Sequence, residues 1–342
     1  MEYHQFILSK TILNTLIDEL CNNKKCEYEI KNIYERFILT LINSIINDTS
    51  SSIFKKINIK TSSIQKLKTE LIDKKHLFKQ KNISSDQLDI IINNRIIKII
   101  NNFLKITTFP TYKYDIEYLD SIKTIKIKVE NKSYSIKTYN SIKLKKYPKK
   151  YVIPMVLQYM SIRFGSQHWS IPQIEYDWLY NNYNVRYEAF ASPLNSRLIG
   201  KTNAKFCSLF YKYDKPFGSM GDFFNVNMLI KKKCNWVCNP PFIEQILEKA
   251  AKKCLMTIKH AKQQKFEIMI FFIMPNWTDS NAYQILNNYK DVKYKQKLSK
   301  RTYWYESTIN IIAQFDSVVF ILDSYTDNVD YSKICDKMLI KS

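Results

Sequence analysis

Glycine is nearly absent from this chain, and its placement constrains what the chain can fold into. The 342 residues include only four glycines, and all of them lie between Gly165 and Gly221. Glycine adopts left-handed backbone angles at little steric cost, so a segment without it is expected to consist of regular elements joined by polar connections. All five tryptophans lie from Trp169 onward. The two halves therefore differ in character, and we predict two domains, residues 1–150 and residues 151–342.

The charge of the chain indicates a polyanionic partner. Lys and Arg number 53 against 31 Asp and Glu, which gives a formal net charge of +22. An excess of this size attracts nucleic acid and speeds its encounter with the protein. The lysine- and isoleucine-rich composition of an AT-rich genome would produce the same excess, so charge alone favours nucleic-acid binding without establishing it.

Several classes of protein are disfavoured by what the sequence lacks. The longest apolar run, Ile268 to Met274, is too short for a membrane span, and the N-terminus has no secretion-signal pattern. We therefore expect an intracellular protein without a membrane partner, and the choice between cytoplasm and nucleus stays open. The seven cysteines match no familiar zinc spacing, so no metal is expected.

Residues 1–150 are predicted to form a mainly helical region with a β-hairpin. Apolar residues recur at helical spacing over residues 6–20 and 29–46, and Ser84 with Gln87 has the pattern of a capping box before a third helix. Residues 124–129 and 133–138 alternate in polarity around a short connection, which predicts the hairpin. The lysines that follow suit a phosphate backbone, and a solvated, lysine-rich edge strand explains them equally well. They are Lys143, Lys145, Lys146, Lys149 and Lys150, interleaved with Tyr147 and Tyr151.

Residues 151–342 alternate short apolar strands with helical segments. Strands are predicted at residues 185–191, 236–238 and 267–274, a helix at 242–260, and two strands within 307–322 around Gln314-Phe315-Asp316. This alternation indicates a doubly wound α/β sheet. Ligands of such sheets bind beyond the carboxyl ends of the strands, here near Ala191, Cys238 and Met274.

Asn239-Pro240-Pro241-Phe242 follows a predicted strand and opens a helix. The prolines stiffen the segment and keep Asn239 and Pro240 extended, so the Asn239 side-chain oxygen and the Pro240 carbonyl can face one amino group. Two acceptors match the two N–H donors of an adenine amino group, and Phe242 can stack on the base. Accepting both N–H bonds localises charge on a weakly nucleophilic nitrogen, so catalysis is mostly positioning and electrostatics. We predict these four residues to be catalytic.

Four segments in one order extend this pattern: residues 190–195, Phe217-Gly218-Ser219, the Asn239–Phe242 motif and residues 272–277. Together they resemble the cap-specific adenosine N6-methyltransferases of the phosphorylated-CTD-interacting-factor family over about residues 169–322. The resemblance implies a Rossmann-like, S-adenosylmethionine-dependent methyltransferase domain. It also implies methyl transfer to N6 of the adenosine next to the 5′ cap of mRNA.

The resemblance also assigns residues to ligands. The loop after the first sheet strand is implied to border S-adenosylmethionine, with Gly218 as a second-loop contact and Asp222 suited to ribose hydroxyls or to forming a turn. That loop comprises Phe190, Ala191, Ser192, Pro193, Leu194 and Asn195. Trp277, Lys300 and Arg301 are further candidates for RNA contact, alongside ordinary packing and solvated surface.

Two alternatives remain at this point. In the first, the same motif methylates adenine in DNA or at internal RNA sites. In the second, the chain is a catalytically inactive, basic RNA-binding partner protein. Capped RNA is the expected partner, with a capping enzyme or another protein as an additional one. A WW domain needs two spaced tryptophans and residues 1–168 contain none, so we do not expect recruitment through such a domain.

Overall fold

The computed structural model describes residues 2–45, 61–79, 83–105, 111–162, 169–290, 292–306, 310–325 and 331. Its residues group into two compact units. The first contains residues 1–117, 126–136 and 148–167, and the second contains residues 118–125, 137–147 and 168–342. The units therefore do not follow a single cut at residue 150, because residues 137–147 group with the later part of the chain and residues 148–167 with the earlier part.

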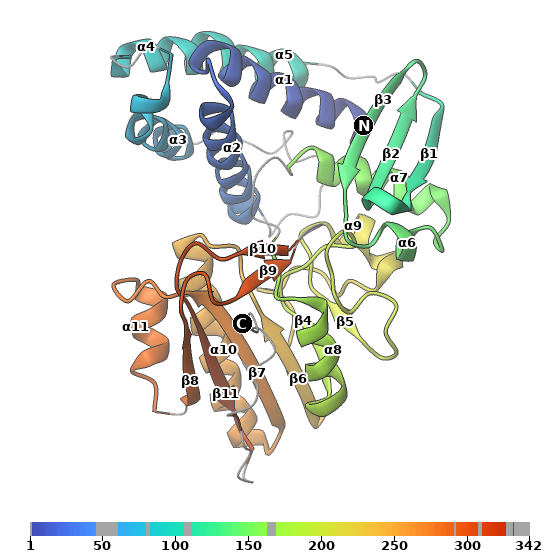
Figure 1. The fold of residues 1–342 in the computed structure, drawn as a ribbon, viewed down its shortest axis with the longest axis vertical. Coiled ribbons are helices and arrows are strands. Elements are labelled where there is room, and N and C mark those ends of the chain that lie inside the picture. Colours follow the sequence, from blue (N-terminus) through green and yellow to red (C-terminus); the bar gives the residue numbers. More distant parts are fainter. Residues whose placement is uncertain are drawn as a thin grey trace. The chain divides into compact units, whose positions relative to one another are not determined.

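The first unit is mainly helical (Figure 1). Its helices are α1 (Glu2–Leu20), α2 (Lys24–Ile45), α3 (Thr61–Asp73), α4 (Ser85–Ile90), α5 (Lys98–Leu104) and α7 (Lys149–Met160), with a π-helical stretch, η2 (Ile91–Ile97), and a short turn, η1 (Lys75–Leu77). Helix α1 packs against α2 and α7, and its apolar residues Leu16 and Leu20 are fully buried. The amphipathic spacing thus predicted α1 and α2 correctly.

The predicted hairpin is confirmed as part of a three-stranded sheet with the order β1-β2-β3. Its strands are β1 (Tyr114–Leu119), β2 (Thr124–Val129) and β3 (Lys132–Lys137), with η3 (Asp120–Ile122) between the first two. A two-residue turn joins β2 to β3, and Glu130 in it has a φ of 51°. The strand β1 was not predicted, because its sequence lacks the regular alternation of its neighbours.

The second unit is built on a six-stranded sheet in the order β5-β4-β6-β7-β11-β8. These strands are β4 (Val185–Glu188), β5 (Lys205–Phe206), β6 (Lys233–Cys238), β7 (Glu267–Pro275), β8 (Val292–Leu298) and β11 (Ser317–Asp323). The strands β5, β4, β6 and β7 pair in parallel, and β11 is antiparallel to both β7 and β8. A second small sheet pairs β9 (Trp304–Glu306) with β10 (Asn310–Ile312).

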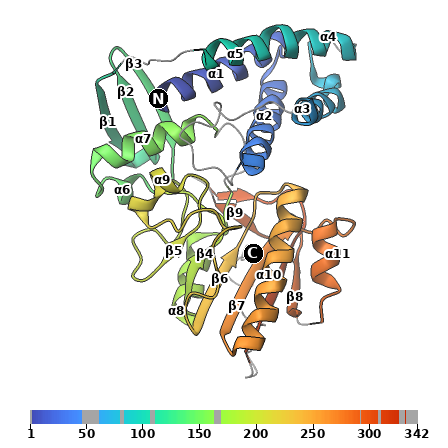
Figure 2. The same ribbon diagram turned by 180° about the vertical axis from the view of Figure 1, so that it is seen from behind.

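Helices cover both faces of the six-stranded sheet. Figure 1 shows α8 (Gln173–Asn182) on one face, and Figure 2 shows α10 (Glu244–Gln264) on the other. Shorter elements are α6 (Ser141–Leu144), α9 (Tyr211–Asp214), η4 (Lys215–Phe217) and α11 (Asn281–Asn287). Alternate side chains of β7 pack on opposite faces of the sheet. Ile270 and Phe272 lie in the hydrophobic core on the α10 side, and Phe271 lies in the core on the α8 side. This sandwich confirms the predicted α/β class.

The structure corrects several predicted boundaries. Strand β4 ends at Glu188 instead of residue 191, because the chain turns sharply at Ser192. Helix α10 starts at Glu244 instead of residue 242, because the Ile243 amide first closes a tight turn onto the Pro241 carbonyl at 2.7 Å. Strand β8 was not predicted; it lies at the edge of the sheet, where its three lysines are exposed. Exposed lysines are a common protection of edge strands against pairing with other chains.

None of the described helices is long and apolar enough to cross a membrane. Six cysteines fall in the described part of the chain, and all six are free thiols. Over the same residues, His, Cys, Asp and Glu form no group of three or more that is suited to a metal ion.

The capping box at α4 gives a test of the helical unit. The Ser84 hydroxyl accepts a hydrogen bond from the Gln87 amide at 3.1 Å, and the Gln87 side chain accepts one from the Ser84 amide at 2.8 Å. We expect Ser84→Ala to destabilise α4 by about 1 kcal/mol, because the first turn loses a partner for its amides. Amide hydrogen exchange of residues 85–90 measures this, and Ser85→Ala is the control. Equal exchange in the two variants would contradict the role of the cap.

Candidate active site

The strand order of the second unit defines a crevice at one edge of the sheet. From β4 the chain passes to β5 on one side, and it then crosses to β6 on the other side of β4. The segments that follow β4 and β6 therefore leave the sheet next to each other and then diverge. Such a switch point is where open α/β sheets bind ligands.

The motif Asn239-Pro240-Pro241-Phe242 lies at this switch point, between β6 and α10. The Asn239 amide Nδ2 donates to the Trp169 carbonyl at 3.2 Å, which fixes the orientation of the side chain. The Asn239 Oδ1 atom is buried and has no hydrogen-bond partner among the described residues. No described group donates to the Pro240 carbonyl either. Two adjacent acceptors are thus left for a ligand.

Phe242 of the motif packs in a group of four aromatic rings that we call the aromatic cluster: Trp169, Phe242, Tyr305 and Phe315. The Phe242 ring meets those of Tyr305 and Phe315 edge-on, each at 5.8 Å between centroids. Trp169 stacks parallel to Phe315 at 6.3 Å. The Tyr305 hydroxyl hydrogen-bonds the Ser317 hydroxyl at 2.8 Å, and burial raises the pKa of Tyr305. The cluster is therefore an uncharged aromatic wall beside Asn239.

Neither Tyr305 nor Phe315 was predicted to belong to the site. They come from a three-residue strand and a bend, where no periodic pattern marks them. Only their proximity to the motif in the folded chain reveals them.

The segment after β4 is held as a tight turn by its own side chains. The Asn195 side-chain oxygen accepts from both the Ser192 amide and the Ser192 hydroxyl at 2.8 Å. The Ser192 hydroxyl also accepts from the Leu194 amide at 3.3 Å. Pro193 and Leu194 are buried, while Phe190, Ala191 and Asn195 are partly exposed. The turn thus leaves Phe190 and Ala191 accessible and is held by Ser192 and Asn195.

A second anchor for this turn comes from the segment after β3, which the sequence analysis did not single out. The Asn140 amide Nδ2 donates to the Pro193 carbonyl at 3.0 Å and to the Ser196 carbonyl at 2.9 Å. The Thr138 hydroxyl donates to the Leu194 carbonyl. Both side chains are fully buried. No local sequence signal marks them, because their partners lie more than fifty residues away in the chain.

Glu188, the last residue of β4, is buried beneath the same turn. Its carboxylate accepts from the Tyr176 hydroxyl at 2.9 Å, the Ser196 hydroxyl at 2.8 Å and the Arg197 amide at 3.1 Å. Burial raises the pKa of Glu188. These hydrogen bonds, and the positive charge of the Arg197 guanidinium, act in the opposite direction. A carboxylate with this many donors serves to hold the turn in place.

Gly218 and Asp222 border the segment after β5. Gly218 ends η4 with a φ of 103°, a left-handed angle that favours glycine. The Ser208 amide donates to the Gly221 carbonyl at 2.8 Å, which brings Asp222 beside the carboxyl end of β5. The Asp222 Oδ2 atom is buried without a hydrogen-bond partner among the described residues. The Asp222 carbonyl accepts from the Asn225 amide at 3.0 Å, so this residue also shapes a turn.

The basic candidates of residues 145–150 divide between the two units. Lys145 and Lys146 belong to the second unit, and Lys149 and Lys150 belong to the first. Lys145 pairs with Asp120 at 3.6 Å, Lys149 pairs with Asp115 at 2.9 Å, and Lys150 lies over the Tyr151 ring at 5.1 Å. Lys146 lines a pocket described below.

Trp277, Lys300 and Arg301 come together at one corner of the second unit. The Asn276 amide donates to the Asp316 carbonyl, and the Lys300 amide donates to the Asp316 carboxylate, each at 2.8 Å. The Arg301 amide bonds the Ala313 carbonyl at 2.8 Å. Trp277 is 39% exposed, so its ring is available to a ligand. This corner adjoins the carboxyl end of β7, at the same edge of the sheet as Asn239.

The fold and the site define a mixed α/β protein with unpaired acceptors and aromatic rings at the carboxyl edge of a mainly parallel sheet. Residues 132–307, just over half of the chain, match the family described as phosphorylated CTD interacting factor 1 WW domain. The chain belongs to this family, as its motifs predicted. It matches no curated protein. The family description names a WW domain, and our expectation that the chain lacks one stays a prediction.

The anchoring of the turn after β4 by Asn140 can be tested directly. We expect Asn140→Ala to lower the free energy of unfolding by about 2 kcal/mol, because two carbonyls lose their donor. Faster hydrogen exchange at residues 194–197 should accompany this loss, measured together with urea unfolding. The matched control is Asn225→Ala, since Asn225 is exposed and its side chain makes no hydrogen bond among the described residues. A change no larger than that of the control would show that Asn140 is not an anchor.

Proposed function

We propose that the chain transfers a methyl group from S-adenosylmethionine to N6 of an adenosine, and that the substrate is the adenosine next to the 5′ cap of mRNA. The observation that carries the proposal is the pair of unpaired acceptors, Asn239 Oδ1 and the Pro240 carbonyl, at the switch point of the sheet. A buried acceptor without a partner is uncommon in proteins, because it forgoes the hydrogen bonds that it made with water. A ligand with two adjacent N–H donors supplies what this pair lacks.

The residues at the edge of the sheet also fit S-adenosylmethionine. Asp222 Oδ2 is an acceptor suited to a ribose hydroxyl, and the partly exposed residues of the turn after β4 border the same crevice. The Rossmann-like methyltransferase fold that we propose is supported by the parallel strands, the switch point and the helices on both faces. The bound cofactor supplies an electrophilic methyl group.

The chain itself contributes positioning and electrostatics. Asn239 Oδ1 and the Pro240 carbonyl accept the two N–H bonds of the adenine amino group, which orients its lone pair and increases its electron density. The bond from Asn239 Nδ2 to the Trp169 carbonyl keeps the acceptor atom turned toward the substrate. The aromatic cluster provides apolar ring surfaces against which a purine stacks and which exclude water. The amino proton leaves to water after transfer.

The choice of capped RNA is supported by family membership and by charge. The motifs occur in the same order as in the cap-specific enzymes, and the net charge of +22 favours a polyanion. Trp277 and Lys300 lie where a neighbouring nucleotide would pass, at the carboxyl edge of β7. The family description names a phosphorylated CTD, and we propose such a peptide as a protein partner bound by a route other than a WW domain, alongside a capping enzyme.

The catalytic role of Asn239 predicts a loss of rate without a loss of fold. We expect Asn239→Ala to slow methyl transfer on the order of a hundredfold or more, because the amino group loses an acceptor in the transition state. The measurement is transfer of label from S-adenosylmethionine to short RNAs that begin with cap-adenosine or cap-guanosine, or that carry no cap. Asn225→Ala is the matched control.

The substrates separate the alternatives. Label on cap-adenosine RNA alone supports the proposal in full. Equal label on uncapped RNA or on DNA overturns the cap assignment and keeps adenine methylation. No label on any substrate, with no binding of the cofactor, overturns the enzymatic proposal.

We expect replacement of the Asp222 carboxylate to have opposite effects on stability and on cofactor binding. Burial raises the pKa of its carboxyl, against the hydrogen bond from Phe224 and the charges of Lys249 and Lys253. Because the pKa is higher in the folded than in the unfolded chain, stability falls as pH rises between these two values and stays lowered at neutral pH. Asp222→Asn should therefore raise the melting temperature at pH 7. It should also weaken S-adenosylmethionine binding at least about tenfold, because a hydrogen bond to a charged group is lost.

Calorimetric titration and thermal unfolding measure the two effects. The control is Asp279→Asn, which removes an exposed carboxylate. Unchanged cofactor affinity in Asp222→Asn would refute the ribose contact.

A further inference from the structure

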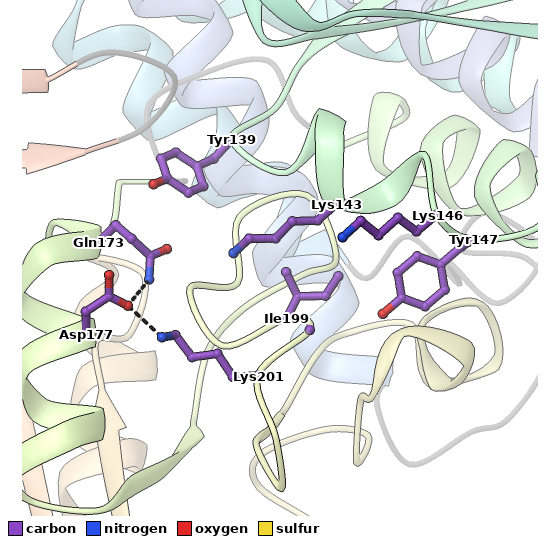
Figure 3. A pocket seen from close by; sticks show the side chains of 9 residues that line it. Tyr139, Lys143, Lys146, Tyr147, Gln173, Asp177, Ile199 and Lys201 are labelled. Atoms are coloured by element: carbon purple, nitrogen blue, oxygen red, sulfur yellow. Dashed lines mark hydrogen bonds and ion pairs between the residues drawn. The ribbon is translucent and has the colours of Figure 1, made fainter.

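A second pocket lies within the second unit, and it shares no lining residue with the Asn239–Phe242 motif. Its volume is about 500 Å³, within the usual range for small-molecule sites. The segment 139–147, the first two turns of α8 and the segment 199–201 form its walls (Figure 3). Its lining side chains are those of Tyr139, Lys143, Lys146, Tyr147, Gln173, Asp177, Ile199 and Lys201.

Positive charge dominates this pocket. Lys201 is matched by Asp177, with 2.7 Å between its Nζ and the carboxylate. Lys143 and Lys146 form no ion pair with any described residue, so two cationic groups on one wall are without a counter-ion. Burial and the nearby charges of Arg197 and Lys201 lower the pKa of Lys143, and a bound anion would favour the charged form of this lysine.

The guanidinium of Arg197 adds to this field from behind the wall. It lies 4.0 Å from the centroid of the Tyr139 ring, and its side chain is fully buried. Among the described residues it forms an ion pair with the Glu306 carboxylate, at 3.5 Å. Lys123 also lies over the Tyr139 ring, at 5.0 Å. Lys143 lies over the same ring at 5.8 Å, so Tyr139 connects the pocket's lysines with this group of cations.

The remaining walls suit an organic group more than a bare ion. Two tyrosine rings, Tyr139 and Tyr147, line the pocket, and Tyr147 is held against Phe217 at 4.8 Å between ring centroids. The Gln173 side-chain nitrogen Nε2 donates to the Asp177 carboxylate at 2.9 Å. The Oε1 atom of the same side chain is buried with no partner among the described residues. Figure 3 shows the amino groups of Lys143 and Lys201 turned toward this Gln173–Asp177 side. Cations, aromatic faces and an unpaired amide acceptor therefore share one cavity.

We propose that this pocket binds a phosphorylated nucleotide, with the phosphate at Lys143 and Lys146 and the base against the tyrosine rings. Lysines bind phosphate as point charges, and aromatic side chains stack bases of any sequence. The nucleotide is either free or one residue of a single-stranded RNA. The inference does not require methyl transfer, so it stands or falls separately from the proposed activity.

The test uses uridine ligands, which carry no adenine and so do not compete for the motif. Calorimetric titration of the full chain, without S-adenosylmethionine, would compare inorganic phosphate, uridine monophosphate, a short oligouridylate and a phosphoserine peptide. We expect uridine monophosphate to bind, and Lys143→Ala with Lys146→Ala to weaken it at least about tenfold, because two charge-assisted contacts are lost. Lys259→Ala on α10 removes an exposed charge in the same unit and should change the affinity less than about twofold.

Further variants make the test specific. Tyr147→Leu should weaken uridine monophosphate and leave inorganic phosphate unchanged, because the ring serves the base. Lys146→Ala alone replaces the double variant if the latter unfolds, since Lys146 is exposed. Tighter binding of oligouridylate than of the monophosphate supports an RNA strand as the ligand, and equal binding supports a free nucleotide. No binding of either, an equal loss in Lys259→Ala, or tighter binding of the phosphoserine peptide would overturn the proposal.

Discussion

The buried guanidinium of Arg197 is the interaction on which the site of the second unit depends. It donates to the Glu306 carbonyl at 2.7 Å and faces the Glu306 carboxylate at 3.5 Å. Glu306 in turn exchanges two backbone hydrogen bonds with Ser170, whose neighbour Trp169 accepts the bond from Asn239. A buried charge left without its partner costs about 3–5 kcal/mol, so this chain of contacts has little freedom to rearrange. The orientation of Asn239 is thus fixed by a residue more than forty positions earlier in the sequence.

The parts of this arrangement that the sequence predicted are those with a local signature. The Asn239–Phe242 motif is visible because two prolines stiffen it and because the apolar residues of β6 precede it. The strands β6 and β7 and the helix α10 follow from periodicity, and the α/β class follows from them. Asn140, Arg197 and Glu306 escaped prediction because each acts through partners that are distant in the chain. A polar residue in a loop looks the same in sequence whether it is solvated or buried beneath a functional turn.

The lysine runs show the same limit for charge. Net charge predicts an anionic partner, but it does not say which lysines meet that partner. In the structure, Lys145 and Lys149 form ion pairs with aspartates, and the lysines of β8 are exposed at the edge of the sheet. Lys143 and Lys146 differ because they line a pocket whose described carboxylate, Asp177, is already paired with Lys201. The absence of a counter-ion in a concave site, and not the density of lysine in the sequence, distinguishes a binding residue from a solvated one.

The unpaired acceptors connect stability with function. Asn239 Oδ1 and Asp222 Oδ2 are buried at the same edge of the sheet without hydrogen-bond partners among the described residues. Each such group costs about 1–3 kcal/mol of stability, and a ligand that donates to it recovers this free energy on binding. Stabilising contacts elsewhere offset this cost, above all those of the anchored turn after β4 and of the buried Arg197–Glu306 pair. A rigid support is therefore a requirement of the site, because acceptors that relaxed toward neighbouring donors would no longer select a ligand by its amino group and hydroxyls.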